Sequence, residues 1–310
     1  MAIRQLFHII HMTDDLAGTE AWYEDVFSPY TLMESSYAED LRRDASLVLL
    51  GDCVIEPLAP TFTAPDWAEF PLGRFFSRFG THWHSLAFYS DDLLDVWRRA
   101  HANGVRVVGN SGASVSVIEN EEQLSENTVI NLHPKDAFTQ IEIASIENGT
   151  ALRDPRLVDG TDFDPEWWIK NHPVKTPGLA YTTVTVPDLD RAEQVYVEGL
   201  GGTLLHKGES ELTGTSDVYV QLGDTVVQLS RPTRDGTLAA QDFEKFGNMH
   251  HAAAFKVQDL DATKEYFDSK GIATLTRDDQ TLITDPATTK GVVFRWTTWD
   301  VPGGPRDTTR

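Results

Sequence analysis

Two segments of the sequence repeat one pattern of residues, and this repeat restricts the possible fold more than any other feature. Residues 84–93 (HSLAFYSDDL) and residues 251–260 (HAAAFKVQDL) share a histidine, an Ala-Phe pair and an Asp-Leu pair at matching positions. Farther along, Gly104 and Gly271 also match, and the separation is 167 residues in both cases. A repeat of this length indicates that the chain consists of two similar halves.

A second pair of segments indicates that each half contains two units. Residues 51–60 and 223–232 both begin with Gly-Asp, which is typical of a hairpin turn, and continue with an apolar, β-favouring run. Residues 8–16 match residues 181–189 in the same way. Apolar strands that alternate with aspartates able to begin helices predict an α+β fold made of tandem βαβββ units.

Changes in composition along the chain predict the domain boundaries. We expect one domain at residues 1–147, a proline-rich and acidic linker at 148–177, and a second domain at 178–310. The predicted units occupy residues 1–60, 80–147, 178–232 and 248–300. Between the first two units lies an aromatic insertion, residues 61–81, which we expect to cover a pocket, to contact the other domain, or simply to extend the core.

The composition disfavours several classes of partner. The net charge of −22 and the isoelectric point of about 4.7 argue against nucleic acid and anionic membranes, because both are negatively charged. No apolar run is long enough to cross a bilayer and no secretory leader follows Met1, so we expect a cytoplasmic monomer or homodimer that acts on a small molecule. The single cysteine, Cys53, excludes a disulfide framework and a zinc site with several thiolates.

Four residues able to bind a metal occupy matching positions in the two N-terminal units. His8 and His84 lie on the first predicted strand of each unit, and Glu56 and Glu142 lie on the last. Two imidazoles and two carboxylates suit a divalent ion of borderline character, with water or substrate in the remaining places. Two inward-facing carboxylates would repel each other without a cation, so the pattern predicts a metal site in the N-terminal half.

These motifs resemble the vicinal oxygen chelate superfamily, which includes glyoxalase I, methylmalonyl-CoA epimerase, extradiol ring-cleaving dioxygenases and fosfomycin or bleomycin resistance proteins. The resemblance rests on Gly-Asp-x-x-x-Glu-x-x-x-Pro at residues 51–60, on Ile-Glu-Ile at 141–143 and on the epimerase-like Leu-His-Pro-Lys-Asp at 132–136. It implies that paired units form two open barrels, and that first and last strands supply the ligands of one divalent ion.

One spacing departs from the pattern of the superfamily. His8 has the usual spacing to the Asp-Leu pair that follows its strand, whereas His84 lies one residue farther from its own pair. We interpret the extra residue as a longer turn, because His251 shows the same spacing. Ser85 and His82 are the alternative ligands, and His82 is also a candidate catalytic proton donor because it should share a face with His84.

The other histidines have simpler interpretations. Strand alternation should turn His11 away from His8, so we interpret it as structural. His250 is expected at the surface, and His133 is expected to organise the turn before the last strand of its unit.

The C-terminal half keeps the pattern of the fold and loses the ligands. At the four matching positions stand Tyr181, Gln228, His251 and Arg295. An arginine there would repel a cation, so we expect a metal-free domain that supports the first one or walls its pocket.

The position of the predicted metal site favours one class of reaction. Extradiol dioxygenases of the superfamily carry iron in the C-terminal half on two histidines and one glutamate, whereas the site predicted here has four ligands in the N-terminal half. We therefore predict an isomerase, epimerase or lyase that uses Zn, Ni, Co, Mn or Mg to stabilise an enolate, with Glu56 or Glu142 as the base and a small oxygenated or acyl-CoA substrate. The alternatives are an iron(II) ring-cleaving dioxygenase and a resistance protein that sequesters a small molecule.

Overall fold

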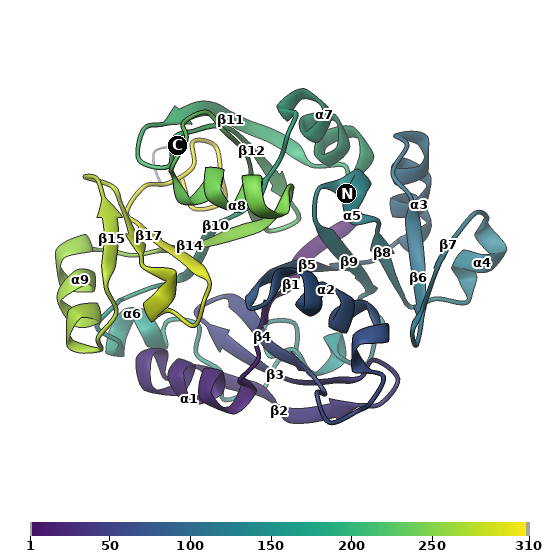
Figure 1. Cartoon of the computed structure of the whole chain (residues 1–310), viewed down its shortest axis with the longest axis horizontal. Helices are drawn as coiled ribbons and strands as arrows, with labels where there is room; N and C mark the ends of the chain where they lie inside the picture. The colour runs from purple at the N-terminus through teal and green to yellow at the C-terminus, as the bar shows by residue number, and fades with distance from the viewer. Residues whose placement is uncertain (1, 308–310) are drawn as a thin grey trace.

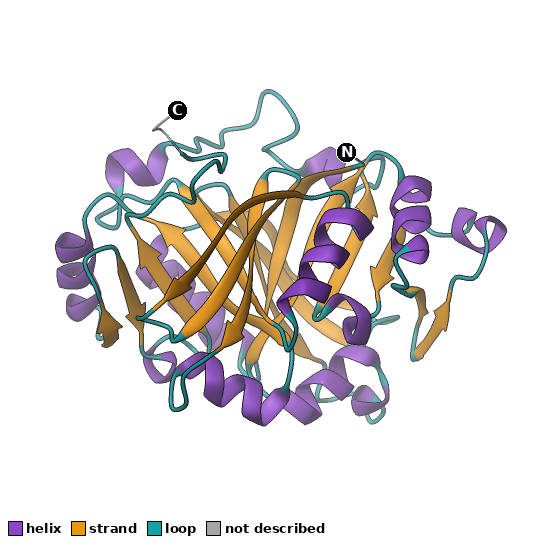
Figure 2. Cartoon of the chain, turned by 90° about the horizontal axis from the view of Figure 1, so that it is seen from above, coloured by secondary structure: helices purple, strands orange, loops and turns teal. Residues whose placement is uncertain are grey.

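The computed structural model describes residues 2–307, which form two curled sheets with helices around their outer surfaces (Figures 1 and 2). The N-terminal sheet contains strands from residues 3–145 and the C-terminal sheet strands from residues 178–297, which confirms the α+β class. The limits of the two domains stay a prediction, and residues 1 and 308–310 lie outside the described part. No helix within residues 2–307 is both long and apolar enough to cross a membrane.

Each unit consists of a first strand, a helix and further strands, and the second unit has one strand more than the others. The N-terminal elements are β1 (Ile3–Met12), α1 (Leu16–Phe27), β2 (Tyr30–Ala38), β3 (Arg43–Leu50), β4 (Cys53–Pro60), η1 (Trp67–Glu69), α2 (Pro71–Phe79), β5 (His82–Ser90), α3 (Leu93–Ala102), β6 (Val107–Ser111), β7 (Ser114–Val117), α4 (Glu121–Ser125), β8 (Val129–Leu132), α5 (Pro134–Ala137) and β9 (Gln140–Ser145). The linker contains η2 (Ala151–Arg153) and α6 (Trp167–Asn171). The C-terminal elements are β10 (Gly178–Thr185), α7 (Leu189–Gln194), η3 (Val195–Gly199), β11 (Thr203–Ser210), β12 (Thr215–Leu222), β13 (Thr225–Pro232), α8 (Leu238–Phe246), β14 (Met249–Lys256), α9 (Leu260–Ser269), β15 (Thr274–Arg277), β16 (Thr281–Thr284), η4 (Pro286–Thr288) and β17 (Val293–Thr297).

The two sheets have the same topology, except that the N-terminal sheet has the additional edge strand β7. The strand orders are β2-β3-β4-β1-β5-β9-β8-β6-β7 and β11-β12-β13-β10-β14-β17-β16-β15. The first strands of the paired units run antiparallel at the centre, β1 beside β5 and β10 beside β14. The last strand of each unit lies parallel to the first, as β4 does to β1 and β9 to β5. First-strand and last-strand residues are therefore neighbours in the sheet, as the predicted metal site requires.

The first helix of every unit begins at the aspartate that the sequence predicted. The side chains of Asp15, Asp92, Asp188 and Asp259 each accept a hydrogen bond from a backbone N–H in the first turn of the helix that follows. These N–H groups have no partner within the helix, so each cap is worth about 1 kcal/mol. The caps fix the point at which each chain segment leaves the sheet.

Strand alternation divides the side chains between a shared core and the interior of each barrel. Ile55, Ile141 and Ile143 point into the largest apolar cluster, which contains residues from both sheets. The residues between or beside them, Glu56 and Glu142, point the other way. One face of these strands therefore packs in the apolar core that the two halves share, and the opposite face lines the polar interior of the N-terminal barrel.

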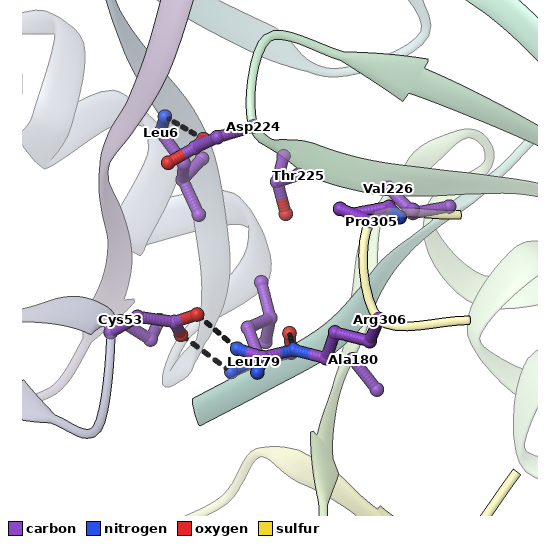
Figure 3. A pocket seen from close by; sticks show the side chains of 10 residues that line it. Leu6, Cys53, Leu179, Ala180, Asp224, Thr225, Val226, Pro305 and Arg306 are labelled. Atoms are coloured by element: carbon purple, nitrogen blue, oxygen red, sulfur yellow. Dashed lines mark hydrogen bonds and ion pairs between the residues drawn. The ribbon is translucent and has the colours of Figure 1, made fainter. Parts of the chain in front are cut away.

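Two matching turns clasp the halves together. Asp52, in the turn between β3 and β4, accepts a hydrogen bond from the backbone N–H of Leu179 on β10 at 2.9 Å. Asp224, in the equivalent turn between β12 and β13, accepts one from the N–H of Leu6 on β1 at 2.7 Å (Figure 3). We refer to these two reciprocal hydrogen bonds as the Asp clasp.

The linker is docked on the N-terminal half through Trp168 and Arg156. Trp168 is 2% exposed, and its indole N–H donates to the carbonyl of Phe27 at 2.9 Å. Arg156 forms a buried ion pair with Asp154 at 2.6 Å and donates to the carbonyl of Leu6. These contacts hold the linker against β1 and the end of α1.

Candidate functional site

The four predicted ligands line one cavity of about 370 Å³ inside the N-terminal barrel. His8 comes from β1, Glu56 from β4, His84 from β5 and Glu142 from β9, so the four central strands each supply one side chain. Far apart in the sequence, these residues meet because the sheet places first and last strands side by side. The structure therefore brings the predicted set together.

His8 and Glu56 lie side by side in this cavity. Both are 4% exposed, and His8 Nε2 lies 3.3 Å from Glu56 Oε2. The orientation does not make a hydrogen bond, so both ring nitrogens of His8 are buried without a partner. Burial, together with the positive charges of Arg43 and Arg156, lowers the pKa of His8 to about 3, which keeps the ring neutral and its lone pair available.

His84 owes its position to a bulge in β5. The pairing of β1 with β5 passes from Ile9–Leu86 to His11–Trp83, so β5 has one residue more than β1 in this stretch. The extra residue that we interpreted as a longer turn is therefore accommodated inside the strand, and that interpretation is wrong. A bulge re-aims side chains, and here it turns His84 into the cavity.

The ring of His84 is held on two sides. Its Nδ1 lies 3.0 Å from the hydroxyl of Ser85, and the ring of Phe75 meets it edge-on with centroids 4.3 Å apart. Burial, and then the nearby His8, lowers the pKa of His84 to about 3. Phe75 belongs to α2, so the aromatic insertion covers this cavity as predicted. The insertion also contacts the other half, because the ring centroids of Phe79 and Phe246 lie 5.4 Å apart.

Glu56 and the half-buried Glu142 line the cavity together with Arg43 and Asp40. Burial, and then the charge of Glu56, raises the pKa of Glu142 to about 7, while Arg43 opposes the rise. Burial also raises the pKa of Glu56, again against Arg43, whose Nη1 lies 3.6 Å from Glu56 Oε1. Sequence patterns gave no sign of Arg43, because it lies at the start of a strand with no motif around it.

The donor set matches a divalent ion in chemical type. Two neutral imidazoles and two carboxyl groups face one cavity, and His8 has no other partner. As the side chains stand, no group of three His, Cys, Asp or Glu residues within 2–307 is arranged so that it could hold an ion. Binding therefore requires the four side chains to converge, and the cavity gives them the space to do so.

His82 does not line this cavity. Its Nδ1 lies 3.0 Å from the carbonyl of Trp83, and its Nε2 lies 3.3 Å from Asp242 of α8, in the other half. Asp242 also accepts from His251 Nδ1 at 2.6 Å. The structure thus places the predicted proton donor in a contact between the halves.

Two of the remaining histidines are core residues. His11 is buried between Tyr23 and the carbonyl of Lys290, in agreement with its structural interpretation. His250, which we expected at the surface, is fully buried, and its Nε2 lies 2.6 Å from Thr182. That expectation is wrong because the other half of the chain covers β14.

In the C-terminal half, the matching positions form a hydrogen-bonded network. Arg295 Nη1 donates to the side-chain oxygen of Gln228 at 2.9 Å and to Thr183 at 3.3 Å, and Thr183 donates to the same oxygen at 2.7 Å. Tyr181 lies in an apolar cluster with Tyr219. A guanidinium group thus stands where the N-terminal half has the Glu142 carboxyl group.

Comparisons with known proteins agree with this architecture. Residues 178–295 match the family model of the Glyoxalase/Bleomycin resistance protein/Dioxygenase superfamily. No curated protein matches the chain in sequence. A mutant 4-hydroxymandelate synthase from Streptomyces coelicolor has a similar structure, with a TM-score of 0.65 and 14% identity over 95% of this chain and 92% of that one.

Methylmalonyl-CoA epimerases match a smaller part of the chain. The enzyme from Mycobacterium tuberculosis is 24% identical over 39% of this chain and 87% of its own, with a TM-score of 0.37. A Streptomyces coelicolor epimerase is 22% identical over 38% of this chain and 94% of its own, with a TM-score of 0.36. The superfamily predicted from the sequence is confirmed by the match of residues 178–295 to its family model, and the chain as a whole shares the fold of the synthase.

Proposed function

We propose that the protein is an enzyme that depends on a divalent metal and acts on a compact, oxygen-bearing substrate in the N-terminal barrel. The observation that carries this proposal is that His8, Glu56, His84 and Glu142, from four different strands, line one cavity. His8 supports it further, because a buried imidazole without any hydrogen bond is costly unless something else binds it.

The four residues would hold the ion as two neutral nitrogen ligands and two oxygen ligands. The ion would supply positive charge that stabilises negative charge developing on a substrate oxygen, as in isomerases, epimerases and lyases that remove a proton beside a carbonyl. Glu56 and Glu142 are the groups placed to take up that proton. Arg43, beside Glu56, can bind a second substrate oxygen or steady the carboxylate.

The walls of the cavity restrict the substrate. Phe7, Ile10, Met33 and Leu47 line it beside the polar groups, and α2 covers it through Leu72 and Phe75. A volume of about 370 Å³ is at the lower end of the range for small-molecule sites. For an acyl-CoA substrate, only the acyl end would enter.

Metal titration tests the proposal directly. The purified protein, stripped with a chelator, is titrated calorimetrically with Zn²⁺, Ni²⁺, Co²⁺, Mn²⁺, Mg²⁺ and, without oxygen, Fe²⁺. We expect one ion per chain in the wild type, and a loss of at least about tenfold in affinity for His84→Ala. His101→Ala, an exposed histidine on α3, is the matched control and should bind as the wild type does.

Two results would contradict the proposal. Unchanged stoichiometry and affinity in His84→Ala would remove this residue from the metal site. Failure of the wild type to bind any of the six ions would remove the site itself. Turnover of a ring substrate with Fe²⁺ and consumption of oxygen would instead identify the ring-cleaving alternative.

A further inference from the structure

The C-terminal barrel contains a second cavity, of about 410 Å³, which shares no residue with the first. It lies beside α8 and the strands β14, β15, β16 and β17. Arg295 and His251 form its polar wall, and Leu238, Leu275 and Ile283 belong to its apolar wall. The ligand of this cavity can be inferred independently of the function proposed for the N-terminal barrel.

Arg295 is the unusual feature of this cavity. It is 2% exposed, yet among the described residues no carboxylate forms an ion pair with it. Its Nη1 is bound by the neutral groups of Gln228 and Thr183, and its Nε is buried without a partner. A buried guanidinium without a carboxylate in direct contact is destabilising, and an anion in the cavity would relieve that cost.

The charged residues around Arg295 are compatible with such an anion. The carboxylate that acts on it electrostatically, Asp217, accepts hydrogen bonds from Ser230 at 2.6 Å and Thr215 at 3.1 Å and does not line the cavity. Arg234 also lines the cavity, and no Asp or Glu is among its described lining residues. In a chain with a net charge of −22, this cavity stands out because two arginines and no described acid line it, although Asp242 contacts its wall through His251. Such a lining favours an anion over a cation.

His251 adds a polar group of fixed orientation. Its Nδ1 donates to Asp242 at 2.6 Å, because a carboxylate can only accept, and this leaves Nε2 as an acceptor. Like His84, His251 lies at a bulge: the pairing of β10 with β14 passes from Thr183–Ala252 to Val184–His250. The duplicated fold therefore aims a histidine into each barrel, beside carboxyl groups in one and beside an arginine in the other.

We infer that the C-terminal barrel binds a small organic anion, a carboxylate with a short apolar body. Arg295 takes the carboxylate with the N–H groups that Gln228, Thr183 and Tyr181 leave free, and Leu238, Leu275 and Ile283 contact the body. Guanidinium groups bind carboxylates and phosphates through the same pair of N–H donors. A phosphate monoester is therefore the alternative ligand. The cavity is wide enough for an aromatic ring with a short acid side chain.

Calorimetric titration of the full chain with three probes tests this inference. The probes are 3-phenylpropionate, phenyl phosphate and the neutral analogue 3-phenylpropan-1-ol. We expect saturable binding of the carboxylate and at least about tenfold weaker binding of the alcohol, since a hydrogen bond to a charged group is worth about 1.5–3 kcal/mol. Tighter binding of phenyl phosphate than of the carboxylate would overturn the assignment to a carboxylate.

Two pairs of variants locate the site. Arg295→Gln should weaken carboxylate binding by about ten- to a hundredfold, and Arg295→Lys by less. Because a buried substitution can unfold the chain, the second pair is placed at Leu275, which is 48% exposed at the rim of the cavity. Leu275→Glu should repel the anion and weaken binding by several-fold, whereas Leu275→Gln should not. Equal binding of acid and alcohol, or wild-type affinity in both Arg295→Gln and Leu275→Glu, would overturn the inference.

Discussion

The protonation of His11 should control how the protein responds to acid. This residue is fully buried where β1 meets the C-terminal half, and its Nε2 lies 2.9 Å from the carbonyl of Lys290. Because a carbonyl only accepts, Nε2 carries the proton, and Nδ1 accepts from the hydroxyl of Tyr23 at 2.8 Å. Both nitrogens of the neutral ring are therefore satisfied, and a second proton would place a positive charge on a fully buried ring.

The size of the effect follows from the shift in pKa. Burial lowers the pKa of His11 from 6.5 to about 4, only partly opposed by the bond to Lys290. The unfolded chain therefore binds this proton more readily than the folded one, so the stability that His11 contributes is present above pH 6.5 and is lost as the pH falls towards 4. A difference of 2.5 pKa units corresponds to about 3 kcal/mol.

Urea denaturation at pH 7.5 and pH 4.5, followed by tryptophan fluorescence in the presence of a chelator, measures this contribution. The wild type should lose about 2.5 kcal/mol more stability over this interval than His11→Gln, whose side chain cannot titrate. The other buried histidines are present in both proteins and cancel in the comparison. His101→Ala should behave as the wild type. Equal losses in wild type and His11→Gln would refute the reasoning.

Two further predictions concern the contacts that join the halves. Asp224→Ala should lower the free energy of unfolding by about 1–3 kcal/mol, because the N–H of Leu6 loses its acceptor, while Asp224→Asn keeps an acceptor and should cost less than half as much. Urea denaturation of the two variants measures this, and equal losses would contradict it. Trp168→Phe should cost about 1 kcal/mol through the lost bond to Phe27, and Trp168→Ala about 3–5 kcal/mol through the cavity it leaves, measured by the same assay with circular dichroism as the probe. Similar losses in the two Trp168 variants would show that burial of the ring contributes little.

Much of the fold could be predicted because the same sequence motifs occur in both halves of the chain. Asp15 and Asp188 begin helices in matching units, and the Gly-Asp turns recur at Asp52 and Asp224. The pattern of the units predicted a strand after the first helix, but the position of β2 could not be predicted, because all of its side chains are exposed or half-buried and show no apolar alternation. It is a strand because it pairs with β3 along its length, which is a property of the sheet and not of its own residues.

The candidate site was predictable as a set of residues but not in its geometry. The spacing of His84 did show an extra residue, but a turn and a bulge add a residue in the same way, and only the pairing with β1 distinguishes them. Arg43 and Phe75 reach the cavity from a strand and a helix whose positions depend on the folded chain. His250 was misjudged for a similar reason, since the contact that buries it comes from Trp83 of the other half.

The Asp clasp has a consequence for how molecules of this protein meet one another. Each turn binds the strand of the opposite half, so the same pair of hydrogen bonds could equally join two chains that exchange halves. What favours the partner in the same chain is proximity: the linker, anchored by Trp168 and Arg156, gives the C-terminal half a high effective concentration at its own N-terminal half. A chain with a loosened linker would therefore be expected to form swapped dimers as its concentration rises.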